Sequence, residues 1–371
     1  MDGPRPIRPE EFTSLSELVD STFEGYSGGM RAAFPLLFDY KNCQNLWVFE
    51  DKGRIVCHVG CHIAEFLIYG CRLKMASVGS VATYPEYRGK GLATQALNAM
   101  EVQVVHEGAA VINISGSRDL YSRFGAVKVG RALVYSIPAG GAPVGLPIRR
   151  AAASDIFTIE RLYEREPVRY HRPLEDWRAM FEAMSHDAVY RRSAIYLLGD
   201  ESAASGYVHM LYGARGDKFY ARVGEYAGYR AQIVAALPAI ARELGAASVE
   251  LRVPDYDPSL RRASELTGVP STADYLTHHT IKIPALETFV RGVKPYIEER
   301  LGRSGAGAIA FQPGTGGSYD VIIGEDRTPF DVPAFTTLVF GSPAEDASGG
   351  GEGLLERIFP VPLPLPGLNY V

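Results

Sequence analysis

A basic, glycine-rich turn between a strand and a helix is the segment of this sequence best suited to chemistry. A strand expected at residues 73–83 leads into Arg88-Gly89-Lys90-Gly91, and a helix is expected from about Gly91 to Glu107. The first turn of a helix has free N–H groups and the positive end of the helix dipole. Glycines let the backbone close around a phosphate, and the arginine and lysine add charge. The pattern predicts a pyrophosphate-binding loop, and the alternative is an ordinary turn with chance charges.

A tyrosine on a short expected helix lies downstream of this loop. The segment Leu120-Tyr121-Ser122-Arg123-Phe124-Gly125 follows a buried strand expected at residues 109–114 and places Tyr121 just before a turn glycine. Such a tyrosine is commonly a core residue, so this signal is weak alone. Its combination with the glycine-rich loop at this distance is a strong signal.

Together, the two segments resemble the GNAT superfamily of N-acetyltransferases. Arg88-Gly89-Lys90-Gly91-Leu92-Ala93 matches the Arg/Gln-x-x-Gly-x-Gly/Ala signature of that superfamily. The resemblance implies that the chain is an enzyme of the acyltransferase class with acetyl-CoA as co-substrate and without a metal. In one respect the sequence departs from the pattern, since Ile114 stands where many members carry an asparagine seven residues before the tyrosine.

The resemblance also implies roles for individual residues. The backbone of Val81 and Thr83 is expected to pair with the pantetheine arm, and the Val81 N–H is expected to stabilise the oxyanion. Tyr121 is expected to protonate the departing thiolate. The residues expected to hold the pyrophosphate are Arg88, Gly89, Lys90, Gly91, Leu92, Ala93 and Thr94.

Two short sequence repeats suggest that the first part of the chain is duplicated. Pro6-Ile7-Arg8 recurs as Pro147-Ile148-Arg149, and Tyr87-Arg88 recurs as Tyr229-Arg230, at offsets of 141 and 142 residues. A linker rich in proline and glycine, residues 138–147, separates the two segments. The second copy reads Tyr229-Arg230-Ala231-Gln232, without the glycines, so we expect it not to bind CoA.

The whole chain resembles a narrower group, the "enhanced intracellular survival" acetyltransferases and their relatives. These have two GNAT-like domains and a C-terminal domain similar to sterol carrier proteins, which residues 337–341 and 354–360 resemble. We therefore expect domains at 1–139, 147–282 and 283–371. The resemblance implies that the Val371 carboxylate returns to the first active site as a base. Relatives form hexamers or smaller homo-oligomers, and the sequence leaves the oligomeric state open. The alternative for the tail is that it merely packs.

The pattern of expected elements favours a mixed α/β fold. In the first segment the order is three strands, a helix, a strand, a short helix and a last strand at Ala132 to Ile137, which predicts one mixed sheet with helices on its faces. The third segment is expected to hold an amphipathic helix at residues 286–301 and strands at 308–311 and 319–323.

Composition and charge argue against several other classes of function. The net charge is −5 and no block of lysine and arginine occurs, so a nucleic-acid partner is not expected. No window reaches the ~18 apolar residues of a membrane span, and the N-terminus lacks a signal-peptide core, so we expect a cytoplasmic protein. Cys57-His58-Val59-Gly60-Cys61-His62 invites a metal site, but a strand would put its cysteines and histidines on opposite faces.

The expected reaction is acetyl transfer to a small-molecule amine. An alkyl ammonium, with a pKa near ~10.4, must lose a proton before it can attack, so a base is needed. The resemblance favours an aminoglycoside or another small, polyamine-like acceptor. The alternatives are an acyltransferase for peptide or protein amines and a non-catalytic acetyl-CoA sensor. Lipid carriage by the third segment is a weaker alternative.

Overall fold

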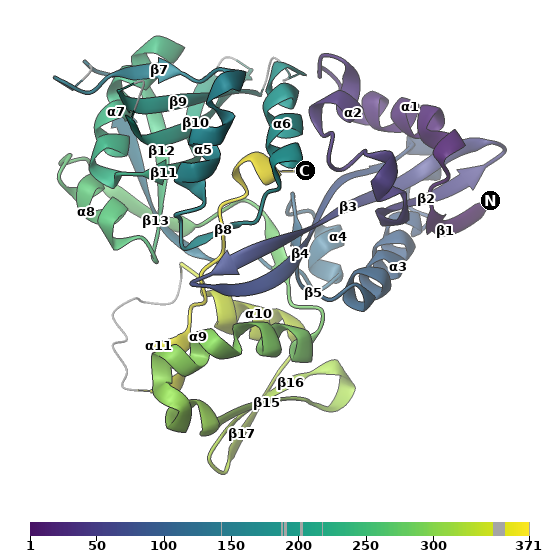
Figure 1. Ribbon diagram of the computed structural model, residues 1–371. Helices are drawn as coiled ribbons and strands as arrows, with labels where there is room; N and C mark the ends of the chain where they lie inside the picture. The colour runs from purple at the N-terminus through teal and green to yellow at the C-terminus, as the bar shows by residue number, and fades with distance from the viewer. Residues whose placement is uncertain are drawn as a thin grey trace.

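The computed structural model describes residues 1–141, 143–186, 188, 191–200, 203–216, 218–343 and 353–370 of the chain (Figure 1). In these ranges the strands form three sheets, each with helices packed against it. The expectation of a mixed α/β fold is confirmed. None of the helices in the described ranges is both long and apolar enough to span a bilayer.

The first sheet has the strand order β1-β2-β3-β4-β5-β14, and β8 pairs with the far end of β3. Helix α3 covers one face through Leu97, Met100 and Val104, and α1 covers the other through Leu15 and Leu18. The bounds of these elements are β1 (Asp2–Pro6), α1 (Phe12–Thr22), α2 (Gly29–Ala33), β2 (Leu46–Asp51), β3 (Arg54–Ile68), β4 (Cys71–Thr83), α3 (Leu92–His106), β5 (Ala109–Ile114), α4 (Asp119–Arg123), β8 (Val168–Tyr170) and β14 (Thr280–Lys282).

The second sheet has the order β13-β6-β12-β11-β10-β9-β7. Its strands are β6 (Arg131–Pro138), β7 (Ile148–Arg150), β9 (Arg192–Asp200), β10 (Ala203–Arg215), β11 (Lys218–Gly228), β12 (Ser248–Pro254) and β13 (Ser271–Tyr275). Its helices are α5 (Ile156–Tyr163), α6 (Leu174–Ala183), α7 (Arg230–Leu244) and α8 (Pro258–Glu265).

The first two sheets exchange a strand, which corrects one expectation. The strand expected at residues 132–137 is present as β6, but it pairs antiparallel with β12 from Pro138 to Ala132. Its side chains Tyr135 and Ile137 join the core of the second sheet, and β14 takes the edge of β5 instead. The prediction that this strand completes the first sheet is therefore wrong. The division at 1–139, 147–282 and 283–371 stays a prediction, because no single cut separates these two sheets.

The third sheet, β15-β16-β17, lies apart from the other two and is covered by α9 and α10. Helix α9 continues beyond the expected end at residue 301, and its backbone departs from helical geometry at Gly302. The elements are α9 (Leu286–Gly307), β15 (Ile309–Pro313), β16 (Tyr319–Ile323), β17 (Asp326–Phe330), α10 (Val332–Phe340) and α11 (Leu354–Ile358).

After α11 the chain leaves the third sheet and runs between the first two (yellow in Figure 1). The Tyr256 hydroxyl donates a hydrogen bond of 2.9 Å to the Leu363 carbonyl on the way. Gly367, with φ of +52°, then packs against the Glu225 carboxylate, where a side chain would collide. This segment, which we call the C-terminal tail (residues 361–370), includes the short 3₁₀ helix η7 (Gly367–Asn369). It brings the end of the described chain to the first sheet.

Candidate active site

A β-bulge bends β4 in the middle of the first sheet. The pairing with β3 slips between His58 and Gly60, so two residues of β4, Ser80 and Val81, lie opposite Val59. Ser80 has φ of +56°, a left-handed conformation that is uncommon in residues other than glycine. Bulges of this kind re-aim the backbone next to active sites.

β4 and β5 are paired before the bulge, and they separate from the bulge onward. Their parallel register ends at Val78 and Ile114, and the last hydrogen bond runs from the Ser115 N–H to the Val78 carbonyl at 3.0 Å. Val81 and Thr83 lie on the separated part of β4. Within the described residues the backbone there has no partner strand on the β5 side, which fits the insertion of an extended arm such as pantetheine. Ile114 is 1% exposed and belongs to the core, so its side chain offers no polar contact.

His58 lies beneath the bulge. Its Nδ1–H points at the Ser80 carbonyl, 2.9 Å away, and its ring stacks on Phe38 with centroids 5.9 Å apart. Burial lowers the pKa of His58 to about 4, so the imidazole is neutral at physiological pH. A side chain at Gly60 would meet its Cε1 atom at 2.8 Å. His58 therefore supports the strained backbone and does not line a substrate pocket.

The cysteines of the same strand are core residues. Cys57 and Cys61 are free thiols with 0% exposure, and burial raises the pKa of both. Within the described ranges no group of three or more histidines, cysteines or carboxylates is placed to hold a metal ion.

The glycine-rich loop follows β4 and begins α3. Gly89 and Gly91 have φ of +76° and +74°, a conformation that side chains other than glycine rarely adopt. Space is open around Gly89, where an added Cβ would meet nothing within 4 Å. The loop is thus an exposed backbone cradle at a helix N-terminus, which fits a pyrophosphate.

The side chains of this loop take different positions. Arg88 lies exposed and its Nε donates 3.1 Å to the Thr83 carbonyl, while the Lys90 ammonium lies 4.5 Å from the centre of the Tyr87 ring. Gly91 and Thr94 are also exposed. Leu92 is buried and fixes the start of α3 to the core, and Ala93 packs partly against the same core. The structure therefore brings together the seven residues that the sequence predicts as phosphate-binding.

Tyr121 lies on α4 and faces the bulge across a cavity of about 100 Å³. Its ring packs on Gly116, where an added Cβ would lie 2.9 Å from its Cε2. Burial raises the pKa of the Tyr121 phenol, so the hydroxyl keeps its proton at neutral pH. Val81 and Tyr121, forty positions apart in the sequence, line one cavity. Its lining is Phe23, Tyr26, Met30, Phe34, Gly79, Ser80, Val81, Ser115, Gly116, Arg118, Tyr121 and Tyr370.

The C-terminal tail reaches this cavity. The Tyr370 ring lies 6.2 Å from that of Phe34 and 5.5 Å from that of His279, and the Arg191 guanidinium lies over it at 4.1 Å. Val371, the expected base, lies outside the described residues. The residue before it stands next to the groups expected to act on the thioester.

A buried ion pair between Arg172, just after β8, and Glu225 on β11 holds the tail. Arg172 and Glu225 are joined by two hydrogen bonds, and their side chains are 1% and 3% exposed. Although burial alone would raise the pKa of Glu225, the adjacent Arg172 guanidinium lowers it. The Nε of Arg172 also donates 2.6 Å to Asn369 Oδ1. Tyr163 and Trp177 flank the guanidinium at 4.1 and 4.6 Å.

The sequence alone did not predict the contact of Arg172 with Glu225 and Asn369, which we call the tail clamp, or the aromatic side chains that line the cavity. Arg172 and Asn369 are 197 positions apart, and no local spacing relates them. Phe23, Tyr26 and Phe34 gave a faint signal, as aromatic residues concentrated between the first helix and the first long strand.

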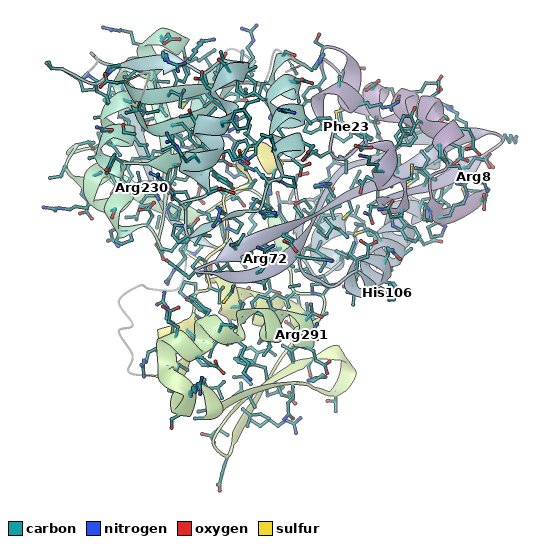
Figure 2. The ribbon with its side chains drawn as sticks, viewed as in Figure 1. Arg8, Phe23, Arg72, His106, Arg230 and Arg291 are labelled. Carbon is teal, nitrogen blue, oxygen red and sulfur yellow. The ribbon has the colours of Figure 1, made fainter. Side chains whose placement is uncertain are left out.

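In the second sheet, the turn before α7 corresponds to the glycine-rich loop, and carboxylates of the chain itself occupy it. Arg230, at the start of α7, pairs with Glu166 at 2.8 Å and with Asp257 at 2.8 Å. The Gly228 N–H also donates to Glu166, at 3.0 Å. Figure 2 shows Arg230 on the side of the second sheet, while Phe23 lies on the side of the first. The carboxylates of Glu166 and Asp257 thus occupy the N–H donors that a bound phosphate would need.

Comparison with known proteins agrees with this geometry. Residues 4–128 match a family described as an acetyltransferase (GNAT) domain. A GCN5-related N-acetyltransferase from Anabaena variabilis is 13% identical with a TM-score of 0.59, and Eis1 from Mycobacterium abscessus is 15% identical with a TM-score of 0.54. Each similarity covers 91% of this chain and 89% of the other. A GCN5-related N-acetyltransferase from Kribbella flavida is 15% identical over 97% of this chain and 96% of its own, with a TM-score of 0.58.

No curated protein matches the sequence. The structural likenesses have low identity and describe the fold. The family match adds the chemistry, because the matched residues contain the bulge, the glycine-rich loop and Tyr121. The N-terminal part of this chain is a GNAT acetyltransferase domain, and the protein is an acyltransferase.

Proposed function

We propose that the chain transfers an acetyl group from acetyl-CoA to a primary amine by direct attack in a ternary complex. One observation carries this proposal. Val81 on the bulge and Tyr121 on α4 line one cavity at the point where β4 and β5 separate. The glycine-rich loop begins α3 just after the same strand. A pyrophosphate on the loop and a thioester at the cavity would be joined along β4.

The chain's own groups account for the steps of the transfer. The amine nitrogen forms a bond to the acetyl carbon, and negative charge develops on the acetyl oxygen, near the Val81 N–H. The carbon–sulfur bond then breaks, and the Tyr121 hydroxyl gives its proton to the leaving thiolate. The proton that the nitrogen loses on becoming an amide restores the Tyr121 hydroxyl. The raised pKa of Tyr121 keeps that proton in place until it is needed.

The ammonium form of the acceptor must lose a proton before the attack. We assign this step to the Val371 carboxylate, because Tyr370 stands in the cavity and the last residue follows it directly. A water path to another base is the competing route. Deleting Val371 distinguishes them, since only the first route requires the carboxylate at that point in the chain.

Release of free CoA thiol from acetyl-CoA tests the proposal. We expect stimulation by at least one primary amine, and a fall of about a hundredfold in the Tyr121→Phe variant, in line with the loss of one general acid. Acetyl-CoA affinity should change little. Tyr229→Phe is the matched control, because that ring is 70% exposed on the second domain. An unchanged rate in Tyr121→Phe would remove the tyrosine from the mechanism. Tight binding of acetyl-CoA without stimulation by any amine would favour a sensor.

A further inference from the structure

A second cavity adjoins the first on the side of the second sheet. It has a volume of about 50 Å³ and shares Tyr26, Phe34 and Tyr370 with the first. Its remaining walls come from α2, α6, the strands β9 and β10, and the tail. Because the first cavity holds Val81 and Tyr121, the second lies beside the point of reaction. It is the described space from which an acceptor amine would meet the thioester.

The walls of this second cavity combine apolar side chains with neutral polar ones and one arginine. Phe34, Leu37, Met180, Met184 and Leu211 contribute to it. Among the described residues that line either cavity, none is aspartate or glutamate, and the lysine and arginine side chains are Arg118 and Arg191. A bound ammonium group needs carboxylates or other acceptors to replace its water. The described lining provides neutral acceptors but no carboxylate, so each additional positive charge on a ligand would be costly.

One wall contains an imidazole with no hydrogen-bond partner among the described residues. His209 is 1% exposed, and neither its Nδ1 nor its Nε2 is bonded within the described part of the chain. Burial lowers its pKa to about 4, so it is neutral and has one donor and one acceptor. Leaving such a group without a partner costs stability. A ligand with a hydroxyl or amide group would satisfy it.

The volumes of the cavities also favour a small acceptor. Sites for drug-sized ligands typically span roughly 300–1,000 Å³. The two cavities at the point of reaction, of about 100 and about 50 Å³, instead suit an amine on a body the size of an amino-acid side chain. An acidic cavity of about 340 Å³ adjoins the second at Leu36 and His62, but it shares no described lining residue with the first. A multi-ring sugar such as an aminoglycoside exceeds this space and carries several ammonium groups.

We propose that the acceptor is a monoamine on an apolar or aromatic body, with one neutral hydrogen-bonding group, and not a polycation. This inference rests on the proposed acetyl transfer and replaces the aminoglycoside or polyamine that the sequence resemblance favours. The apolar wall takes the body of the molecule and His209 takes its polar group. Tyr370 closes the space between acceptor and thioester.

The test compares four probes by CoA release: 2-phenylethylamine, tyramine, spermidine and kanamycin. We expect kcat/KM to be at least tenfold higher for the two aromatic monoamines than for the two polycations. Tyramine should exceed 2-phenylethylamine, and His209→Phe should remove that difference. Equal or higher kcat/KM for spermidine or kanamycin would overturn the inference and leave acetyl transfer intact. If acetyl-CoA binds and no amine of a wider panel stimulates release, the proposed function itself fails, and this inference with it.

A charge added to the wall gives a second test that does not depend on the buried histidine. Met184 is partly exposed and lines the second cavity. Met184→Glu should raise the ratio of kcat/KM for spermidine to that for 2-phenylethylamine several-fold. Met184→Gln has the same size without the charge and should leave that ratio near the wild-type value. No change in the ratio in Met184→Glu would mean that this cavity does not receive the acceptor.

Discussion

Replacing Asn369 by alanine is expected to loosen the C-terminal tail from the active site. Asn369 is 7% exposed, and its Oδ1 accepts a hydrogen bond of 2.6 Å from the buried Arg172 guanidinium. The Arg172–Glu225 pair remains intact in the variant, because its two hydrogen bonds do not involve the tail. The substitution therefore removes one anchor of Tyr370 without leaving a buried charge alone.

The size of the effect follows from the type of bond. A hydrogen bond to a charged group contributes about 1.5–3 kcal/mol, and ~1.4 kcal/mol is a factor of ten in an equilibrium. The ratio of docked to released tail should thus fall by about ten- to a hundredfold. When release is fast compared with cleavage, trimming by a carboxypeptidase follows the released fraction. Trimming should accelerate by the same factor.

Carboxypeptidase digestion followed by mass spectrometry measures this rate directly, and CoA release measures its consequence. We expect amine acetylation to fall in Asn369→Ala while acetyl-CoA affinity stays near the wild-type value. Asn98→Ala is the matched control, because Asn98 is exposed on α3. Equal trimming rates in Asn369→Ala and Asn98→Ala would refute the idea that Arg172 holds the tail.

Two further predictions concern the cofactor loop and the pH dependence of stability. Gly91→Val forces a β-branched residue to a φ of +74°, so the affinity for acetyl-CoA, measured by calorimetry, should fall by at least about tenfold. An affinity within about twofold of the wild-type value would mean that the loop does not hold the pyrophosphate. The free energy of unfolding should fall between pH 6.5 and 4, because three buried histidines stay neutral in the folded chain and gain protons when it unfolds. With an unfolded pKa of ~6.5, each should contribute about 2 kcal/mol less at pH 5 than at pH 7.5, measured by urea unfolding; equal values at both pH values would refute this. Burial lowers the pKa to about 4 in His58 and His209 and to about 3 in His279.

The parts of the site that could be predicted from sequence are those whose geometry is local. The loop from Arg88 to Thr94 needs particular residue types at consecutive positions, because glycine conformation and helix N-termini act over a few residues. Helix α3, at Leu92–His106, lies within one residue of the expected bounds. Tyr121 could be found for the same reason, since its turn glycine is only four positions away.

The strand exchange could not be predicted, because pairing depends on which sheet edge is free. β6 is the longer and more apolar segment, whereas β14 consists of Thr280, Ile281 and Lys282, so pattern alone favours β6 as the neighbour of β5. Only the full set of neighbours decides that β6 pairs with β12 from Ala132 to Pro138. The tail clamp is unpredictable for a similar reason, because Arg172, Glu225 and Asn369 come from three distant segments.

The role of His58 could not be predicted from the sequence. The alternation in residues 57–62 places the histidines and the cysteines on opposite faces of a strand and argues only against a metal site. The structure places His58 under the bulge, where its Nδ1 contacts the carbonyl of the left-handed Ser80. It thereby supports the backbone that presents Val81 to the cavity. Arg172, which follows β8, also acts indirectly, because it holds the tail that carries Tyr370. The geometry of the cavity thus depends on two buried side chains that do not line it, His58 beneath the bulge and Arg172 beside the tail.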